Sequence, residues 1–493
     1  MWVYYMKRIL CILLTVIISL SCCVCAFASN TSADVINEED KVYPFVLLRG
    51  MDLQGVRVDV GTENERPAMG EITAGGVIGT LAKATVKGIV NGSMDPAVGT
   101  VVDYIRGIFE YYSIDCNGQP VYNTGMKEYP LSMDHYTDFD DGESKNEEGM
   151  IRTAKEKYGG KYVYYINYDW RLNPLEVADT VNEYVERACR ETGCEKVNLV
   201  CASMGGVMTV AYLSKYSCDR VNKCVFLSST FCGTYVTSDL LQGNVTVGAA
   251  QLRNFAYTYL GENKLLTPVL KFLDLTGIWD GVAKLANRFV SRYKGMVYDE
   301  FLRDVFGNMP SLWALVLPED YEACKEFMFG GKESEYAGII AIADELQDMM
   351  SKRDDMLRAA VADGMKICVV ANYGRQVIPI YDRSYQNGDG TLETHLVSGG
   401  AVVAPIGETL GDDYVCSNPE YLSPSREIDA STCLFPEYTW FVKGAPHVSG
   451  NYGSDYSDFI FWLVDYNGQP TVRSNPKYPQ FMQSASDQHI DFE

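Results

Sequence analysis

The sequence predicts an α/β protein with a mostly parallel central sheet, helices on both faces and a helical cap insertion. Short, continuous apolar runs alternate along the chain with segments of helical periodicity, which is the pattern of a parallel sheet covered by helices. The runs are apolar at nearly every position, as expected for strands buried on both faces. A long internal stretch then carries helical patterns and no convincing strand, which indicates an insertion between two strands.

The expected strands are five apolar runs, and the expected helices lie between them. The runs are 43–50, 161–170, 196–201, 223–229 and 365–374. Asn173 and Pro174 predict the start of a helix, because Asn is a favoured N-cap and Pro a favoured first residue. Apolar residues then recur at helical spacing from Val177 to Cys189, and a second helix is expected at 205–216.

Two insertions are expected. The segment 231–364 indicates a helical cap, with helical patterns at Gln251–Leu275, Ile278–Arg292 and Ile339–Val361. The segment 70–112 mixes glycines with apolar faces. It predicts a core helix pair, with a small lipid-contacting element as the alternative.

An acidic loop is expected at 135–149. It is most simply a solvated surface, with a calcium site as the alternative.

The chain therefore divides into parts along its length. The parts are a signal peptide (1–28), a first portion of the α/β core (29–230), the cap (231–364), a second portion of the core (365–466) and a polar C-terminal tail (467–493).

The N-terminus has the layout of a secretory signal peptide. Lys7 and Arg8 precede an apolar run from Ile9 to Leu20, and small residues follow up to Ala28. This predicts a secreted protein. An uncleaved membrane anchor is the alternative, because the run is about long enough to cross a bilayer. No later segment is apolar enough to span a membrane.

The chain is strongly acidic. It carries a formal net charge of −23, with 65 Asp and Glu against 42 Lys and Arg. Such a surface repels nucleic acid and gains nothing overall from anionic lipid headgroups. Nucleic acid is therefore not expected as a partner, and any membrane contact must be driven by apolar surface.

The cysteines do not predict a metal site. Four of the 15 lie in residues 1–28, which leaves 11 in the rest of the chain, without a C-x-x-C pair among them. The chain has only 4 histidines, so a zinc site is not expected. Most of these cysteines, such as Cys224 and Cys368, lie in apolar runs and are expected to be small core residues. An odd number in an exported chain implies at least one unpaired thiol, and the pairing stays open.

The stretch "KVNLVCASMGG" (196–206) places Ser203 between an expected strand and an expected helix. This is the setting of a nucleophile elbow, whose tight turn exposes a serine hydroxyl at the N-terminus of a helix. The usual spelling is G-x-S-x-G; here Cys201 replaces the first glycine and Gly205 keeps the second. A serine that merely caps a helix is the alternative.

A serine elbow requires an acid and then a histidine on loops after later strands. Asp389 lies in the Gly-flanked loop "YQNGDGTLETH" after the strand at 365–374. His447 follows "EYTWFVKGAP" and precedes the apolar stretch 459–464 of an expected closing helix. The order Ser203, Asp389, His447 predicts the triad of an α/β-hydrolase. The oxyanion donors are expected to be the N–H groups of Met204 and, in the loop after the first strand, Met51.

Several stretches together resemble the lecithin:cholesterol acyltransferase and lysosomal phospholipase A2 family. Two departures are Ala202 before the nucleophile, where the family usually has His, and Arg49-Gly50, where it usually has Pro-Gly. The stretches, which cover most of 43–466 in the family's order, are "YDWR" (168–171), "SMGG" (203–206), "FLSSTFCGT" (226–234), "MPSLWALVLP" (309–318) and "GDGT" (388–391) before a final His.

The resemblance implies an acyl-ester hydrolase or transferase acting on lipids, with a lid over an acyl-binding cleft. It carries the triad over to Ser203, Asp389 and His447, and the oxyanion donors to Met51 and Met204. Within "YDWR" a structural role is expected, with an Asp169–Arg171 pair.

The sequence thus predicts a secreted hydrolase or O-acyltransferase that cleaves a phospholipid-like acyl ester through an acyl-enzyme, without metal or organic cofactor. Its partners are the lipid or other acyl-ester substrate and, transiently, a membrane or lipid-aggregate surface. Two alternatives stay open. One is a general carboxylesterase or neutral-lipid lipase, and the other is a catalytically inactive surface binding protein on a hydrolase scaffold.

Overall fold

The structure is a computed structural model that describes residues 42–71, 74–93, 95–136, 145–260, 267–381, 386–447, 454–486 and 489–491. The segment expected to be a signal peptide lies outside these residues, as does most of the acidic loop expected at 135–149. Within the described part of the chain, no helix is both long and apolar enough to cross a membrane.

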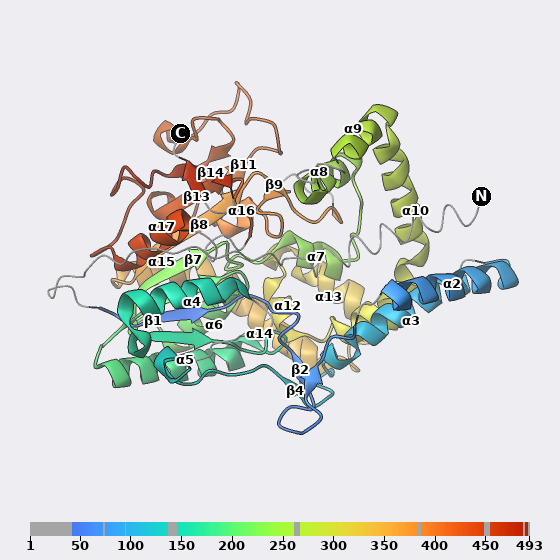
Figure 1. Cartoon of the computed structure of the whole chain (residues 1–493), viewed down its shortest axis with the longest axis horizontal. Helices are drawn as coiled ribbons and strands as arrows, with labels where there is room; N and C mark the ends of the chain where they lie inside the picture. Colours follow the sequence, from blue (N-terminus) through green and yellow to red (C-terminus); the bar gives the residue numbers. More distant parts are fainter. Residues whose placement is uncertain are drawn as a thin grey trace.

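A single large sheet forms the centre of the molecule (Figure 1). Its first seven strands along the chain run parallel, and the eighth, at one edge, is antiparallel. In spatial order the strands are β15 (His489–Asp491), β14 (Phe481–Ser486), β13 (Thr439–Lys443), β8 (Lys366–Tyr373), β7 (Val221–Leu227), β6 (Val197–Ala202), β1 (Phe45–Leu48) and β5 (Val163–Ile166).

Helices cover both faces of this sheet, as predicted. Side chains of one strand alternate between two cores: in β1, Val46 and Leu48 pack on one face, and Phe45 and Leu47 on the other. The five apolar runs are confirmed as β1, β5, β6, β7 and β8. The first core includes residues of α5 (Pro174–Thr192) and α6 (Gly205–Tyr216), and the second those of α4 (Lys145–Tyr158) and α17 (Ser454–Asp465).

The start of α5 follows from its capping residues. The Asn173 side chain accepts a hydrogen bond from the Leu175 N–H at 3.0 Å, and Pro174 occupies the first helical position. Gly193 ends the helix in the left-handed conformation that glycine adopts without strain.

The chain between β7 and β8 is helical. The long pattern expected at Ile339–Val361 is divided into α14 and α15, with Lys352 in a turn between them. Both of these helices pack beside α6, so they also cover the sheet. The helices are α7 (Tyr235–Leu241), α8 (Ala249–Leu260), α9 (Thr267–Thr276), α10 (Ile278–Val297), α11 (Arg303–Val305), α12 (Pro310–Leu315), α13 (Tyr321–Phe329), α14 (Ala337–Ser351) and α15 (Arg353–Ala362).

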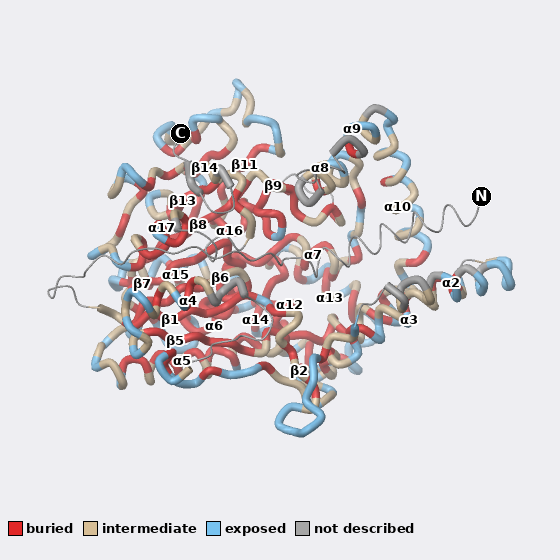
Figure 2. The backbone as a smooth tube through the Cα atoms, viewed as in Figure 1, coloured by how far each residue is buried: buried red, intermediate tan, exposed pale blue. Residues whose placement is uncertain are grey.

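The second insertion is a helix pair, α2 (Ala74–Asn91) and α3 (Asp95–Phe109). Val98, Val102 and Phe109 of α3 join the core of the body. The far end of α2 extends away from the body, and its outer surface is exposed (Figures 1 and 2). The helix α3 therefore has buried residues along its length, whereas the far end of α2 is exposed.

The C-terminal segment does more than form a polar tail, because it supplies β14 and β15 to the edge of the sheet. Shorter elements surround the body. They are β2 (Arg57–Val58), β3 (Arg66–Pro67) and β4 (Thr124–Gly125) in one small sheet, β9 (Arg375–Gln376) with β10 (Asn387–Gly388), β11 (Val402–Val403) with β12 (Ile428–Asp429), and the helix α16 (Thr394–Val397).

Candidate active site

Ser203 lies in a sharp turn between β6 and α6. Its φ of 51° is unusual for a residue other than glycine and marks local strain of the kind found at functional turns. The turn is hydrogen-bonded to the end of β7 and to the loop after it. The Ser203 N–H donates to the Leu227 carbonyl at 3.1 Å, and the Ser203 carbonyl accepts from the Thr230 N–H at 2.9 Å. The serine is thus held at the carboxyl end of the central strands.

Two glycines after the serine let the helix pack closely. A Cβ on Gly205 would lie 2.5 Å from the Leu48 carbonyl oxygen, and one on Gly206 would lie 1.7 Å from Ser229 Oγ. No side chain fits at either position without movement of the neighbouring chain. The two glycines of the "SMGG" motif are therefore required by the close packing of α6 against β1 and the end of β7.

Cys201 occupies the first glycine position of the usual elbow spelling. Its side chain is buried in the sheet, where its Sγ lies 3.8 Å from Cys224 Sγ and 3.4 Å from the Val225 carbonyl oxygen. It is therefore a small core residue, as expected from its size. Of the 11 cysteines within the described ranges, 8 are buried.

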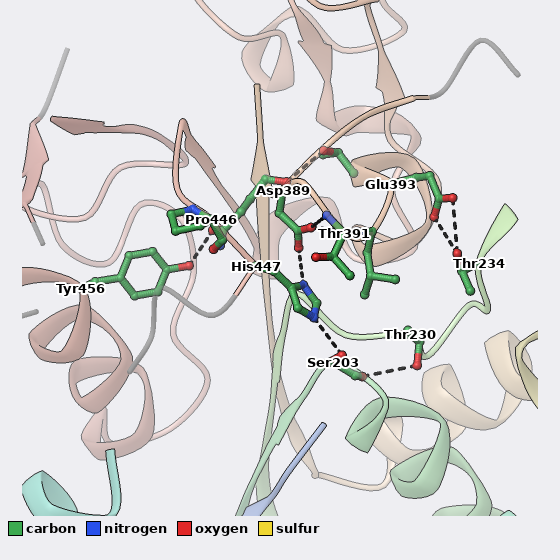
Figure 3. A network of polar contacts seen from close by, with 12 residues as sticks. Ser203, Thr230, Thr234, Asp389, Thr391, Glu393, Pro446, His447 and Tyr456 are labelled. Carbon is green, nitrogen blue, oxygen red and sulfur yellow. Dashed lines mark hydrogen bonds and ion pairs between the residues drawn. The ribbon is translucent and has the colours of Figure 1, made fainter. Parts of the chain in front are cut away.

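The three residues predicted as a triad form a continuous chain of hydrogen bonds (Figure 3). His447 Nε2 lies 2.8 Å from Ser203 Oγ, and His447 Nδ1 lies 2.7 Å from Asp389 Oδ2. The Asp389 side chain is fully buried, and that of His447 is 12% exposed. With a proton on Nδ1 donated to Asp389, the other ring nitrogen is an acceptor for the serine hydroxyl proton.

The turn 388–392 holds Asp389 through its other carboxylate oxygen. Asp389 Oδ1 accepts from the Thr391 N–H at 2.9 Å and from the Leu392 N–H at 2.7 Å, which leaves Oδ2 for His447. Gly390 has a φ of 98°, and a Cβ on Gly388 would lie 2.0 Å from the Leu392 carbonyl oxygen. The "GDGT" stretch therefore requires both of its glycines.

Asn372, at the end of β8, joins the segments that carry the acid and the histidine. Its Nδ2 donates to the Pro446 carbonyl at 2.9 Å, and its Oδ1 accepts from Tyr456 OH at 2.6 Å. Its own carbonyl accepts from Thr394 Oγ1 at 2.9 Å. Sequence reasoning missed this residue, although a buried polar side chain in the apolar run "VVANY" was an available signal.

The loop after β1 runs directly over the nucleophile. A Cβ on Gly50 would lie 2.7 Å from Ser203 Cβ and 3.2 Å from its Oγ. Met51 follows on this loop with a partly exposed side chain, and Met204 is buried next to Ser203. Of the two residues expected to supply the oxyanion N–H groups, Met204 thus follows the serine directly, and Met51 follows the glycine that approaches it.

The "YDWR" stretch supports the same loop. Tyr168 OH donates to the Arg49 carbonyl and Trp170 Nε1 to the Asp52 carbonyl, both at 2.9 Å. The buried Arg49 forms an ion pair with Asp52 at 2.9 Å. The predicted pair is also present, with Arg171 Nη2 lying 2.6 Å from Asp169 Oδ2. Sequence reasoning gave this stretch a structural role; the structure shows that it holds both sides of Met51.

We expect Gly50→Ala to impair the nucleophile. The new methyl group would displace either the loop or Ser203, and misplacement by about 1 Å can cost on the order of 100-fold in rate. The measurement is kcat/KM on a soluble ester. Gly99→Ala is the matched control, because a Cβ there meets no atom within 4 Å in α3. Equal activity of the two variants would contradict the close approach of this loop to Ser203.

Within the described residues, no group of three or more His, Cys, Asp or Glu side chains is placed to hold a metal ion. The calcium alternative for the acidic loop falls largely on residues outside that part of the chain.

Comparisons with known proteins agree with this architecture. A family model described as "alpha/beta hydrolase fold" matches residues 150–267, which include the elbow but neither Asp389 nor His447. A search of curated proteins gives no significant match. Among solved structures, a chain of "The crystal structure of Tle4-Tli4 complex" is 10% identical with a TM-score of 0.36, covering 72% of this chain and 89% of that one. At this score the similarity is too low to inform function.

The predicted fold class is therefore confirmed: the protein has the α/β-hydrolase fold. This class indicates a hydrolase in general terms. A fold alone does not fix the reaction, which has to be argued from the site.

Proposed function

We propose that this protein is a serine-dependent lipid acyl hydrolase or O-acyltransferase. The observation that carries the proposal is the chain of hydrogen bonds from Ser203 Oγ through the His447 ring to Asp389, with distances of 2.8 and 2.7 Å. A serine with a histidine base and an orienting acid is the arrangement that activates a hydroxyl for acyl transfer.

The reaction has two halves. His447 Nε2 removes the Ser203 hydroxyl proton while Oγ attacks the ester carbonyl carbon, and the N–H groups of Met51 and Met204 stabilise the resulting oxyanion. The bond to the alcohol then breaks, and the alcohol leaves with the proton from His447. Water or a lipid alcohol next gives its proton to His447 and attacks the acyl-enzyme. The acid or new ester departs, and the Ser203 hydroxyl is restored.

A lipid substrate is supported by the exposed end of α2. Val86, Ile89 and Val90 are 58%, 66% and 76% exposed, which is unusual for three apolar side chains on one short stretch. Lys83 and Lys87 lie beside them, and 74–91 contains no Asp or Glu in an otherwise acidic chain. An apolar surface flanked by lysines suits the interface of an anionic lipid layer. We propose that this end of α2 makes the transient membrane contact.

The triple variant Val86→Ser/Ile89→Ser/Val90→Ser tests this contact. Loss of the apolar area should lower hydrolysis of lipid in anionic vesicles by about tenfold or more, without changing kcat/KM on a soluble ester. Val415→Ser is the matched control, because Val415 is an exposed valine elsewhere, 87% exposed. Undiminished vesicle hydrolysis, or an equal loss on the soluble ester, would argue against the contact.

Profiling of the products from mixed lipid vesicles tests the substrate class. We expect fatty acid and a lyso-lipid, or an acylated lipid alcohol, to appear with the wild-type protein and not with Ser203→Ala. Cleavage of short soluble esters alone would favour a general carboxylesterase. A folded protein that turns over no ester would favour the inactive binding protein.

We also propose that residues 1–28 direct export. N-terminal sequencing of the exported protein should then find Ser29 first, whereas retention of Met1 would favour the membrane-anchored alternative.

A further inference from the structure

The buried carboxylate of Glu393 joins the helical insertion to the turn that carries Asp389. It lies four residues after Asp389 and is fully buried. One oxygen accepts from Tyr381 OH at 2.6 Å and from the Val236 N–H at 3.3 Å, and the other accepts from Thr234 Oγ1 at 3.0 Å. Thr234 and Val236 lie at the start of α7, in the helical insertion that follows β7. Figure 3 shows Thr234 bonded to Glu393.

The backbone around Glu393 belongs to the same small unit as Asp389. Glu393 forms an isolated bridge with Gly388, on the other side of the turn. Asp389 in turn donates its N–H to the Leu392 carbonyl at 3.1 Å. A displacement of Glu393 therefore moves the chain on both sides of Asp389.

A second contact joins the same two segments. The ring of Tyr235, the first residue of α7, stacks on the ring of His395 in α16, with centroids 6.2 Å apart and planes 3° from parallel. The adjacent Thr394 is bonded to Asn372, which also holds Pro446 beside His447. The start of the insertion is thus connected to the segments of both the acid and the base.

We propose that Glu393 is a positioning residue. It couples the position of the start of α7, and with it the helical insertion, to the alignment of Asp389 with His447. The inference rests on the proposed function for its kinetic consequences, but the coupling itself is a property of the fold. Its chemical basis is a buried acceptor with three donors, and an apolar substitute would remove the acceptor that these donors share.

Hydrogen exchange tests the coupling independently of any activity. In Glu393→Ala, amides of 388–397 and of 234–241 should both exchange about tenfold faster, because the hydrogen bonds of the Glu393 carboxylate hold both segments. The matched control is Asp429→Asn. Asp429 is also buried and accepts from a tyrosine hydroxyl, a serine hydroxyl and a backbone N–H, but its partners are Tyr414 and Ser431, which belong to neither 388–397 nor 234–241. Faster exchange confined to 388–397, or none, would overturn the coupling.

Kinetics then test the effect on the triad. Glu393→Ala should lower kcat by about tenfold with little change in KM, because Asp389 would no longer hold the His447 ring in line with Ser203. Glu393→Gln, which keeps an acceptor oxygen, should recover most of kcat. A folded Glu393→Ala protein with the wild-type kcat would overturn the inference. A wild-type protein without esterase activity would instead refute the proposed function and leave the exchange test to decide the coupling.

If Glu393→Ala does not fold, Tyr381→Phe decides the matter. It removes the 2.6 Å hydrogen bond to Glu393 and keeps the ring. We expect a several-fold lower kcat with little change in KM; an unchanged kcat would contradict the positioning role.

The charge of Glu393 also gives stability a pH dependence. Burial raises the pKa of this carboxyl from 4.5 to about 7, although the hydrogen bonds from Tyr381, Thr234 and Val236 act to lower the pKa. The nearby titratable groups are Tyr381 and His395. Because the pKa of Glu393 is raised in the folded state, folding favours its protonated form. Its contribution to the free energy of unfolding is therefore complete below about pH 4.5 and is lost as the pH rises to about 7. The Tm of Glu393→Gln relative to wild type should therefore be higher at pH 8 than at pH 5. A difference that does not change with pH would contradict a buried, titrating Glu393.

Discussion

Ser203→Ala should abolish ester hydrolysis, with kcat falling on the order of ten-thousand-fold or more and the fold unchanged. The substitution removes the attacking oxygen but keeps the Cβ that packs against the loop at Gly50. The backbone bonds of the elbow, to Leu227 and Thr230, do not involve the hydroxyl. We therefore expect the Tm to change by no more than about 3 °C.

A double variant sharpens this prediction. Residues of a triad act as a unit, so Ser203→Ala/His447→Ala should be no slower than Ser203→Ala alone. A further large loss in the double variant would mean that His447 acts on substrate independently of Ser203. Retained turnover in Ser203→Ala itself would refute the serine mechanism.

Asp389→Asn should produce the second largest loss, on the order of ten-thousand-fold in kcat. The two carboxylate oxygens have separate partners: Oδ1 accepts from the Thr391 and Leu392 N–H groups, and Oδ2 faces His447 Nδ1. An asparagine can keep its oxygen on the turn, which places its NH₂ group toward the imidazole. The ring then carries its proton on Nε2, where it cannot accept the proton of Ser203.

The turn itself should survive this substitution, since its two N–H groups keep an acceptor. Hydrogen exchange of 388–397 in Asp389→Asn should therefore match wild type, which separates the chemical effect from misfolding. Asp429→Asn is again the matched control, with a buried carboxylate that holds a different segment. Loss of activity in the control to the same degree would point to a general effect of removing buried charge.

The sheet and the candidate triad could be predicted from sequence because both leave local signals. The strands are continuous apolar runs, and Ser203 follows one of them with small residues on both sides. Asp389 lies between glycines that its turn requires, and histidines are so few that His447 is conspicuous. Each signal depends on a few adjacent residues, which a sequence displays directly.

The supporting contacts could not be predicted, because they join residues far apart in the chain. Glu393 bonds to Thr234 and Val236 across the whole helical insertion. Tyr168 and Trp170 bond to a loop more than a hundred positions earlier. The strand β14 was missed for another reason: "FMQSAS" is too polar to be recognised as a buried strand, although it pairs in parallel with β13 on one side and antiparallel with β15 on the other.

Covalent labelling with a fluorophosphonate tests the central claim most directly. The reagent requires a serine activated by a base, and peptide mapping by mass spectrometry reports which residue it modifies. We predict one adduct on the folded protein, at Ser203, formed slowly in Asp389→Asn and absent in Ser203→Ala. A folded wild-type protein that remains unlabelled, or is labelled instead at the neighbouring Ser228 or Ser229, would contradict the assignment of Ser203 as the nucleophile.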